Sequence, residues 1–302
     1  MGKYNSPLRY PGGKGKITPF VSHLLTQNGI KGTYIEPFAG GAGIAVNLLL
    51  SGQVHDIIIN DLDDGVYSFW KTVVTEPDWL IKAIEKIPFD TQTGLEKIGT
   101  GRAYWFWYTI RTRYIRNRYH RTRDKALDFF LLNRMNVSGI IKGGPIGGRK
   151  QTGRYNISSR FNKQNLIQRI TAISDMSSHI TVINHEATTF LNKLSNEDYC
   201  DLNDCFVFAD PPYYVQGRHL YNTFATNRIH ELIAEQLLGQ HDWKWILTYD
   251  EAPQINNLYP NDRVNKFEYE IMYSANKHGQ SREYLFADPR LTMEPFNNVT
   301  LN

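Results

Sequence analysis

A short run at residues 210–213 combines a carboxylate, two prolines and an aromatic ring directly after an apolar stretch. That stretch, Cys205–Ala209, predicts a buried strand, and the carboxyl ends of such strands bind ligands in open α/β sheets. An exocyclic amine on a heteroaromatic ring is a poor nucleophile because its lone pair is delocalised. A carboxylate and a backbone carbonyl that accept its two N–H bonds make the nitrogen more electron-rich. We therefore predict amine chemistry at four catalytic residues: Asp210, Pro211, Pro212 and Tyr213.

Each member of this run has an expected part. Asp210 and the carbonyl of Pro211 would accept the N–H bonds, and Tyr213 would stack on the flat ring. Proline restricts the preceding backbone, which would keep both acceptors in place. The alternative is a turn that begins a helix, because Asp is a good N-cap and Pro is common in a first helical turn. The position after a buried strand favours the catalytic interpretation.

A second candidate site is the glycine-rich turn at residues 36–43, which follows the predicted strand Thr33–Ile35. Glycine lets the backbone approach a ligand closely because no Cβ intervenes. Asp61 ends the next predicted strand, where its carboxylate would accept bonds from ribose hydroxyls. The third glycine of the dinucleotide fingerprint is missing. The pattern favours a ribose-bearing cofactor over a tight turn without a ligand.

The loop around Lys14 lacks the first glycine and the Ser or Thr of a phosphate-binding loop. Its lysine would instead suit the carboxylate of an amino-acid-like ligand. On this segment alone, an ordinary solvated turn is the better interpretation.

Taken in order, four motifs resemble those of the Dam-type, adenine-specific DNA methyltransferases over nearly the whole chain. They are Leu8–Lys14, Glu36–Gly40, Asn60-Asp61 and Asp210–Tyr213. The resemblance implies S-adenosyl-L-methionine as cofactor. It also implies methyl transfer to the exocyclic amino group of adenine in duplex DNA, by base flipping and direct transfer, without a metal.

The resemblance places Lys14 near the carboxylate end of the cofactor and Asp61 on its ribose. The sequence departs from the family at Ala42, where a second glycine is common, and at Glu186, which stands in place of an aspartate next to a phenylalanine. The cofactor-binding residues that the resemblance implies are Tyr10, Lys14, Glu36, Phe38, Gly40, Asp61 and Glu186.

Basic residues are concentrated in one segment. Residues 101–160 hold 14 Lys and Arg against 2 Asp and Glu, an excess of +12, whereas the rest of the chain sums to −8 and the whole chain to +4. This asymmetry is typical of a protein that binds a polyanion. On a continuous helix, Arg113, Arg116 and Arg123 share one face, which suits a phosphate backbone. A solvated surface helix is the alternative, and the scarcity of acidic residues in the segment disfavours it.

Downstream, residues 131–142 resemble the family's target-reading hairpin region. Lys142 stands where arginine is common in the family, and lysine contacts guanine without the rigid fork of arginine. The target sequence of better-known members therefore does not transfer to this chain. The predicted DNA-binding residues are Arg113, Arg116, Arg123, Asn133, Arg134 and Lys142.

Apolar runs that alternate with helical stretches must position these residues. Strands are predicted at residues 33–35, 57–59, 179–184, 205–209 and 243–248, with helices at 44–50 and 228–238. Two more runs, 264–273 and 283–287, are predicted to form an antiparallel edge pair. The predicted fold is α/β, a Rossmann-like doubly wound methyltransferase sheet with an inserted, mainly helical target-recognition domain. Residues 1–64 and 165–302 would form the cofactor-binding catalytic domain, and 65–164 the DNA target-recognition insertion.

Composition excludes several other classes of protein. Cys200 and Cys205 are too few for a disulfide framework and, without further ligands, make a poor zinc site, so no metal is expected. No apolar run approaches the roughly 18 residues of a membrane span, and no signal peptide is recognised. We expect a cytoplasmic protein of a prokaryote or phage that acts on double-stranded DNA. A separate companion restriction endonuclease is compatible with this expectation.

Two other functions remain open. The same catalytic run would serve an amino group of RNA or a protein amide, although the basic segment favours a long polyanion. A DNA-binding regulator without catalysis is the second alternative, which the intact Asp210–Tyr213 and Asp61 disfavour. Incubation with labelled cofactor would separate these functions, according to whether the label enters DNA, RNA, protein or none of them.

Overall fold

The computed structural model describes residues 6–10, 14–196, 199–214, 227–271, 282–297 and 299–301. Two compact units make up the chain. Met1–Gly13 and Asp63–Ser178 form a helical unit, and Lys14–Leu62 and His179–Asn302 form a sheet unit. The sequence placed the joins at residues 64/65 and 164/165. Helix α7 (Lys163–Ser174) contacts helices α3 (Asp64–Thr75) and α4 (Pro77–Glu85), so the structure groups it with the helical unit.

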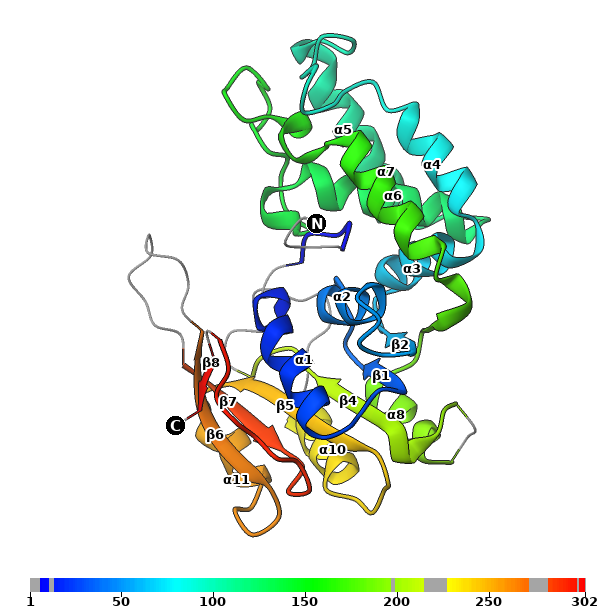
Figure 1. Ribbon diagram of the computed structural model, residues 1–302. Coiled ribbons are helices and arrows are strands. Elements are labelled where there is room, and N and C mark those ends of the chain that lie inside the picture. The colour runs from blue at the N-terminus through cyan, green and yellow to red at the C-terminus, as the bar shows by residue number, and fades with distance from the viewer. Residues whose placement is uncertain are drawn as a thin grey trace. The chain divides into compact units, whose positions relative to one another are not determined.

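The sheet unit is built on one eight-stranded sheet, in the order β3-β2-β1-β4-β5-β7-β6-β8 (Figure 1). The first five strands of that order, β3 to β5, run parallel to one another. The other three pair antiparallel: β7 with β5, β6 with β7, and β8 with β6. The strands are β1 (Thr33–Glu36), β2 (Asp56–Asn60), β3 (Ile180–Ile183), β4 (Cys205–Ala209), β5 (Lys244–Asp250), β6 (Asn265–Ile271), β7 (Arg282–Ala287) and β8 (Val299–Leu301).

Helices cover both faces of this sheet, as expected for strands buried throughout, such as β1 and β4. Apolar side chains of α8, α10 and α11 join Ile35, Val207 and Leu247 in one core cluster. On the other face, α2 contacts β1 and β2 and packs with α1. The helices of this unit are η1 (Lys14–Ile17), α1 (Thr18–Gln27), α2 (Gly43–Leu50), α8 (Ala187–Asn196), η5 (Leu202–Asp204), α10 (Asn227–Leu237) and α11 (Pro253–Leu258).

The predicted doubly wound α/β sheet is thereby confirmed. The last two predicted runs do pair antiparallel, as β6 and β7, but they do not form the edge, because β8 pairs with β6 and lies outside it. Residues 272 and 273 of the predicted edge strand lie outside the described residues. The sequence did not indicate that β7 would lie between β5 and β6. This order matters because it brings β7 next to the last parallel strand.

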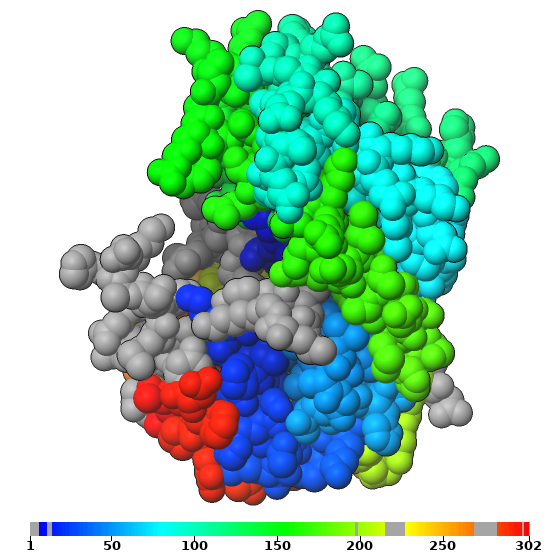
Figure 2. Space-filling model, turned by 45° about the horizontal axis from the view of Figure 1, so that its top comes forward, coloured from blue at the N-terminus to red at the C-terminus, as the bar shows by residue number. Residues whose placement is uncertain are grey.

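Residues near the end of the chain lie against α1. The side-chain amide of Asn28 donates to the carbonyl of Thr292, whose N–H donates back to Asn28 Oδ1, both at 2.9 Å. The ring of Phe296 stacks on His23 with 4.1 Å between centroids. Figure 2 shows these C-terminal residues in red beside the blue N-terminal part of the sheet unit.

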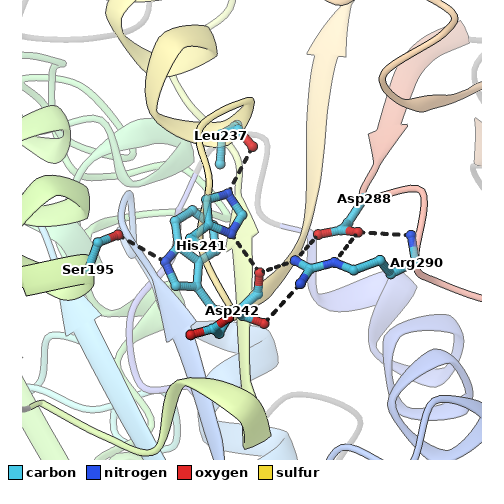
Figure 3. Close-up of polar contacts among 7 residues, drawn as sticks. Ser195, Leu237, His241, Asp242, Asp288 and Arg290 are labelled. Carbon is cyan, nitrogen blue, oxygen red and sulfur yellow. Dashed lines mark hydrogen bonds and ion pairs between the residues drawn. The ribbon is translucent and has the colours of Figure 1, made fainter.

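A group of polar contacts anchors the amino end of β5 (Figure 3). Arg290 pairs with Asp288 and donates to the carbonyls of Asp242 and Trp243. Both ring nitrogens of His241 lie beside carbonyl oxygens, of Trp243 at 2.8 Å and of Leu237 at 3.0 Å. These bonds tie the loop before β5 to the segment after β7, which fixes both strands at the end opposite the predicted site.

The helical unit packs its helices around an aromatic core, in which Phe69 of α3 stacks on Phe130 of α6 at 5.3 Å. No helix among the described residues is both long and apolar enough to span a membrane. The same residues contain no group of three or more His, Cys, Asp or Glu side chains suited to a metal. The helices are α3 (Asp64–Thr75), α4 (Pro77–Glu85), α5 (Thr100–Arg116), α6 (Thr122–Met135), η2 (Val137–Gly139), η3 (Ile157–Arg160) and α7, with η4 (Ser177–His179) at the join.

Candidate functional site

The predicted site residues of the sheet unit lie along the carboxyl edge of the parallel strands. β1 is flanked by β2 on one side and by β4 on the other, so the strand order reverses between β1 and β4. Ligands of open α/β sheets bind beside such a switch point. Glu36 ends β1, Asp61 follows β2, and Asp210 follows β4. The sheet therefore brings the glycine turn and the predicted catalytic run, residues 210–213, to neighbouring strand ends.

The glycine turn is held to the loop after β2. The N–H of Gly40 donates to Asp61 Oδ2 at 2.7 Å, and the N–H of Ala39 donates to the carbonyl of Asn60 at 2.9 Å. Ala42, where the family often has glycine, adopts φ 44° in the left-handed region that favours glycine. The turn therefore keeps its shape without a glycine at this position.

Asn60 joins three loops at this edge. Its side chain is fully buried and its Nδ2 donates to the carbonyls of Pro37 and His185. Its Oδ1 accepts the N–H of His185 at 2.9 Å. The loops after β1, β2 and β3 are thus fixed relative to one another by a single side chain.

Glu36 is buried beneath the turn. Its Oε1 accepts the N–H of Ala45 at 3.1 Å and the hydroxyl of Tyr34 at 3.3 Å. Burial raises the pKa of Glu36 to about 8, although both hydrogen bonds favour the charged form. In this structure Glu36 supports the start of α2 from inside the core.

This raised pKa predicts a pH-dependent stability. The contribution of Glu36 is complete below the ordinary pKa of 4.5 and is lost as the pH rises through about 8, because over this range the unfolded chain releases the proton while the folded chain still holds it. The free energy of unfolding of the wild type should therefore fall, relative to that of Glu36→Gln, between about pH 5 and pH 9. Urea unfolding at both pH values measures this difference. A difference between the wild type and Glu36→Gln that stays constant across this pH range would contradict the raised pKa.

Asp210 lies at the end of β4 in a partly buried position, with 22% of its side chain exposed. The hydroxyl of Thr248 on β5 donates to Asp210 Oδ1 at 2.7 Å, and Lys14 Nζ lies 3.5 Å from the same oxygen. Burial raises the pKa of Asp210, while Lys14 and Thr248 act in the opposite direction. Beyond the catalytic run, Tyr214 N–H donates to Asp250 Oδ1 at 2.8 Å, so β5 holds the Asp210 carboxylate at one end of the run and the backbone of Tyr214 just after the other end.

Lys14 is buried beside the catalytic run. Its Nζ donates to Glu283 Oε2 at 2.6 Å and to the hydroxyl of Tyr213. The sequence did not single out Glu283. A signal exists, because one glutamate opens an otherwise apolar stretch that becomes β7, but its partners come from distant parts of the chain. Pro11–Gly13, which precede Lys14 in the predicted motif, lie outside the described residues.

The other predicted cofactor residues have different surroundings. Glu186 accepts the N–H groups of Thr188 and Thr189 at 2.9 and 3.1 Å, so its carboxylate caps α8. Phe38 is half-buried and packs against the core cluster. Tyr10 is half-buried and belongs to the helical unit.

The predicted basic face is not continuous. Helix α5 ends at Arg116, Asn117 adopts the left-handed φ of 48°, and α6 begins only at Thr122. The expectation of one helical face from Arg113 to Arg123 is therefore wrong. The small number of acidic residues in 101–160 also gave a wrong indication that the basic residues are unpaired, because their acidic partners lie on other helices or beside them. Arg113 pairs with Asp128, Arg123 with Glu76 and Lys125 with Asp64.

Asn133 is buried and its amide is occupied within the unit. Its Oδ1 accepts the N–H of Arg9, and its Nδ2 donates to the carbonyls of Arg9 and Gly139. We therefore assign Asn133 a structural role, in which it holds the backbone of Arg9 and Gly139, in place of the expected contact with DNA. Arg116 is exposed on the last turn of α5.

The predicted target-reading region begins as helix and then forms a short closed loop. Leu131–Met135 belongs to α6, and the N–H of Ile146 donates to the carbonyl of Met135 at 2.8 Å. The N–H of Val137 donates to the carbonyl of Gly144 at 3.0 Å. Lys142 lies exposed within this loop.

A cluster of four arginines forms where the sequence indicated only Arg134. Arg134 donates to the carbonyls of Arg160 and Pro7, Arg169 to that of Ser6, and Arg9 to that of Asn136. Burial lowers the pKa of Arg134 to about 9, and repulsion from the other three arginines of the cluster contributes. Among the described residues, no carboxylate pairs with Arg9, Arg134, Arg160 or Arg169.

Comparison with known proteins adds independent findings. Residues 10–278 match the family described as D12 class N6 adenine-specific DNA methyltransferase. Type II methyltransferase M.MjaIII of Methanocaldococcus jannaschii is 25% identical over 211 residues, which cover 68% of this chain and 68% of that protein. A similar solved structure is the rRNA methyltransferase aviRa from Streptomyces viridochromogenes, with a TM-score of 0.40 and 14% identity, covering 92% of this chain and 87% of that one. The family match extends over both units.

Proposed function

Because the chain belongs to the D12 class N6 adenine-specific DNA methyltransferase family, we propose that methyl transfer takes place at the carboxyl edge of its sheet unit. The protein is an adenine-specific DNA methyltransferase that uses S-adenosyl-L-methionine, which supplies the methyl group on a positively charged sulfur. One observation carries the assignment of the site: Asp61, Gly40 and Asp210 follow three neighbouring parallel strands on both sides of the switch point.

The residues at the ends of β1 and β2 fit this cofactor. Asp61 is half-buried and already accepts one backbone N–H through Oδ2, so its carboxylate is oriented along the turn where ribose hydroxyls would bind. A Cβ added at Gly43 would lie 3.9 Å from Gly15 Cα, which indicates how closely the two loops approach. Asp61, Gly40 and the backbone of the turn would hold the cofactor, with Lys14 at the border between this turn and the catalytic run.

Asp210 would act on the adenine amino group. The group enters after the base turns out of the duplex, at an unstacking cost of a few kcal/mol. The Asp210 carboxylate and the Pro211 carbonyl would accept its two N–H bonds, which increases the electron density on the nitrogen. The ring of Tyr213 would stack on the base. The bond from Thr248 supports this role, because it orients the carboxylate before the base arrives.

We assign the phosphate contacts of the DNA to the arginine cluster in place of the predicted basic helix face. The four positive charges have no carboxylate partner within the described residues and repel Arg134 or one another, and a polyanion relieves that repulsion. Arg113 and Arg123, by contrast, are already neutralised by acids within the unit. Arg116 and Lys142, both exposed, remain candidate DNA contacts.

This assignment predicts a defined salt dependence. Arg160→Ala and Arg169→Ala should each weaken binding to a duplex oligonucleotide and reduce the slope of log K against log salt by about 1, because each removes one phosphate contact. Fluorescence anisotropy at several salt concentrations measures both quantities. Arg228→Ala, which removes an exposed arginine paired with Glu231, is the matched control. Unchanged slopes in both cluster variants would contradict the assignment.

The function itself is tested by incubating plasmid DNA, RNA and protein with labelled S-adenosyl-L-methionine. Label should enter the N6 position of adenine in duplex DNA, and label in RNA or protein alone would exclude the proposed substrate. The similarity to a Type II methyltransferase supports modification of one fixed target site, alongside a separate endonuclease. Sequencing of methylated adenines should therefore reveal a single short motif.

A further inference from the structure

We propose that Glu283 is a positioning residue for methyl transfer, which holds Lys14 away from Asp210 and fixes the ring of Tyr213. The inference rests on the proposed function, in which Asp210 accepts a hydrogen bond from the adenine amino group. Glu283 itself touches neither the substrate nor the cofactor in this proposal. It acts through the two side chains that it binds.

The geometry gives Glu283 two separate partners. Its Oε1 accepts the hydroxyl of Tyr213 at 2.6 Å, and its Oε2 accepts Lys14 Nζ at 2.6 Å. Glu283 is 4% exposed and Lys14 is 7% exposed. Hydrogen bonds in such a water-poor place are strong, and an ionised carboxylate strengthens them further. One side chain therefore sets the positions of two groups that border Asp210.

The fold makes Glu283 a rigid support. It lies on β7, in register with Asp250 of the neighbouring strand β5. Asp250 accepts the N–H of Tyr214, and Thr248 of the same strand donates to Asp210. Polar side chains of β5 and β7 thus hold the catalytic run, and side chains on strands are positioned more precisely than side chains on loops.

The distances show what Glu283 does to the charge of Lys14. Lys14 Nζ lies 2.6 Å from Glu283 Oε2 but 3.5 Å from Asp210 Oδ1. Within the described part of the chain, Asp210 is the other carboxylate that pairs with this buried ammonium, so the loss of Glu283 would leave Asp210 as its partner there. The present ion pair of 3.5 Å would then shorten, and the closer ammonium would withdraw electron density from the carboxylate that accepts the amino N–H. Glu283 therefore keeps Asp210 available as an acceptor.

The test compares Glu283→Gln with wild type, with the double variant Glu283→Gln/Lys14→Met, and with the exposed control Glu235→Gln. We expect Glu283→Gln to lower kcat about 10- to 100-fold, with little change in the KM for S-adenosyl-L-methionine or in DNA affinity. The double variant should be faster than Glu283→Gln, because no ammonium is left to pair with Asp210. Glu235→Gln should keep wild-type kcat.

Wild-type kcat in Glu283→Gln would overturn the inference, and so would a double variant no faster than the single one. Should Glu283→Gln not fold, Tyr213→Phe removes the hydroxyl bond to Glu283 but keeps the ring, and its kcat should fall while DNA affinity stays. Full activity of Tyr213→Phe would then overturn the inference. If Asp210→Ala is inactive but Glu283→Gln keeps the wild-type kcat, the proposed function stands and only the role of Glu283 is excluded. If Asp210→Ala is active, neither the proposed catalytic site nor the role of Glu283 stands.

Discussion

Asp210→Ala is expected to lower kcat for adenine methylation by about 100- to 10,000-fold, because the carboxylate that accepts the amino N–H is lost. Cofactor affinity should change little, since the glycine turn and Asp61 are held by their own bonds. The fold should persist as well, because Lys14 keeps its bond to Glu283. The decrease should therefore appear in single-turnover methylation and not in cofactor binding.

Single-turnover transfer of label to duplex DNA measures the chemical step, and calorimetric titration with S-adenosyl-L-methionine measures cofactor binding. Asp262→Ala, which removes an exposed aspartate from a loop of the same unit, serves as control and should keep full activity. Thr248→Val should give an intermediate rate, because Asp210 then loses only its orienting hydroxyl. A rate for Asp210→Ala within tenfold of wild type would remove Asp210 from the catalytic role.

Arg113→Ala is expected to lower the free energy of unfolding by about 3 kcal/mol, because it leaves the carboxylate of Asp128 buried without its cation. Asp128 is fully buried and accepts bonds from Arg113 and from Tyr119. The value lies at the low end for broken buried pairs, since more than half of the Arg113 side chain is exposed and Tyr119 remains as a donor. DNA affinity of the folded variant should stay close to that of the wild type.

Urea unfolding measures the stability, and anisotropy below the unfolding transition measures DNA binding. Arg113→Ala/Asp128→Asn provides the matched control, because it removes the buried charge together with its partner and should recover part of the lost stability. Weaker DNA binding with unchanged stability would restore Arg113 to the DNA interface and contradict the ion pair's role.

The local pattern of apolar residues was sufficient to predict the parallel strands of the sheet unit. The strands β1, β2 and β4 are short apolar runs buried on both faces, and each is followed by the glycine, carboxylate or proline that marks its carboxyl end. Since parallel strands align these ends, the sequence predicts Asp61 and Asp210 at the carboxyl edge of the sheet, where the structure has them. The order and direction of the strands are enough to bring Asp61 and Asp210 to the same edge of the sheet, whatever contacts their side chains make.

Side-chain contacts between segments that are far apart in the sequence could not be predicted from local pattern. Nothing local to Arg113 indicates that Asp128 lies across the turn between two helices, because the break at Asn117 depends on one residue adopting a positive φ. The partnership of Lys14 with Glu283 depends on β7 entering the sheet beside β5, which no periodicity reveals. The arginine cluster was missed for the same reason, since its members come from four segments of the helical unit.

The bond between Lys14 and Glu283 joins residues 269 positions apart. During synthesis, the first of these residues leaves the ribosome long before the second has been translated. The glycine turn and Asp210 also precede Glu283, so a growing chain can complete its cofactor edge while the support of Tyr213 is still missing. An incomplete chain on the ribosome would therefore lack the support of both Lys14 and Tyr213 until β7 has joined the sheet beside β5.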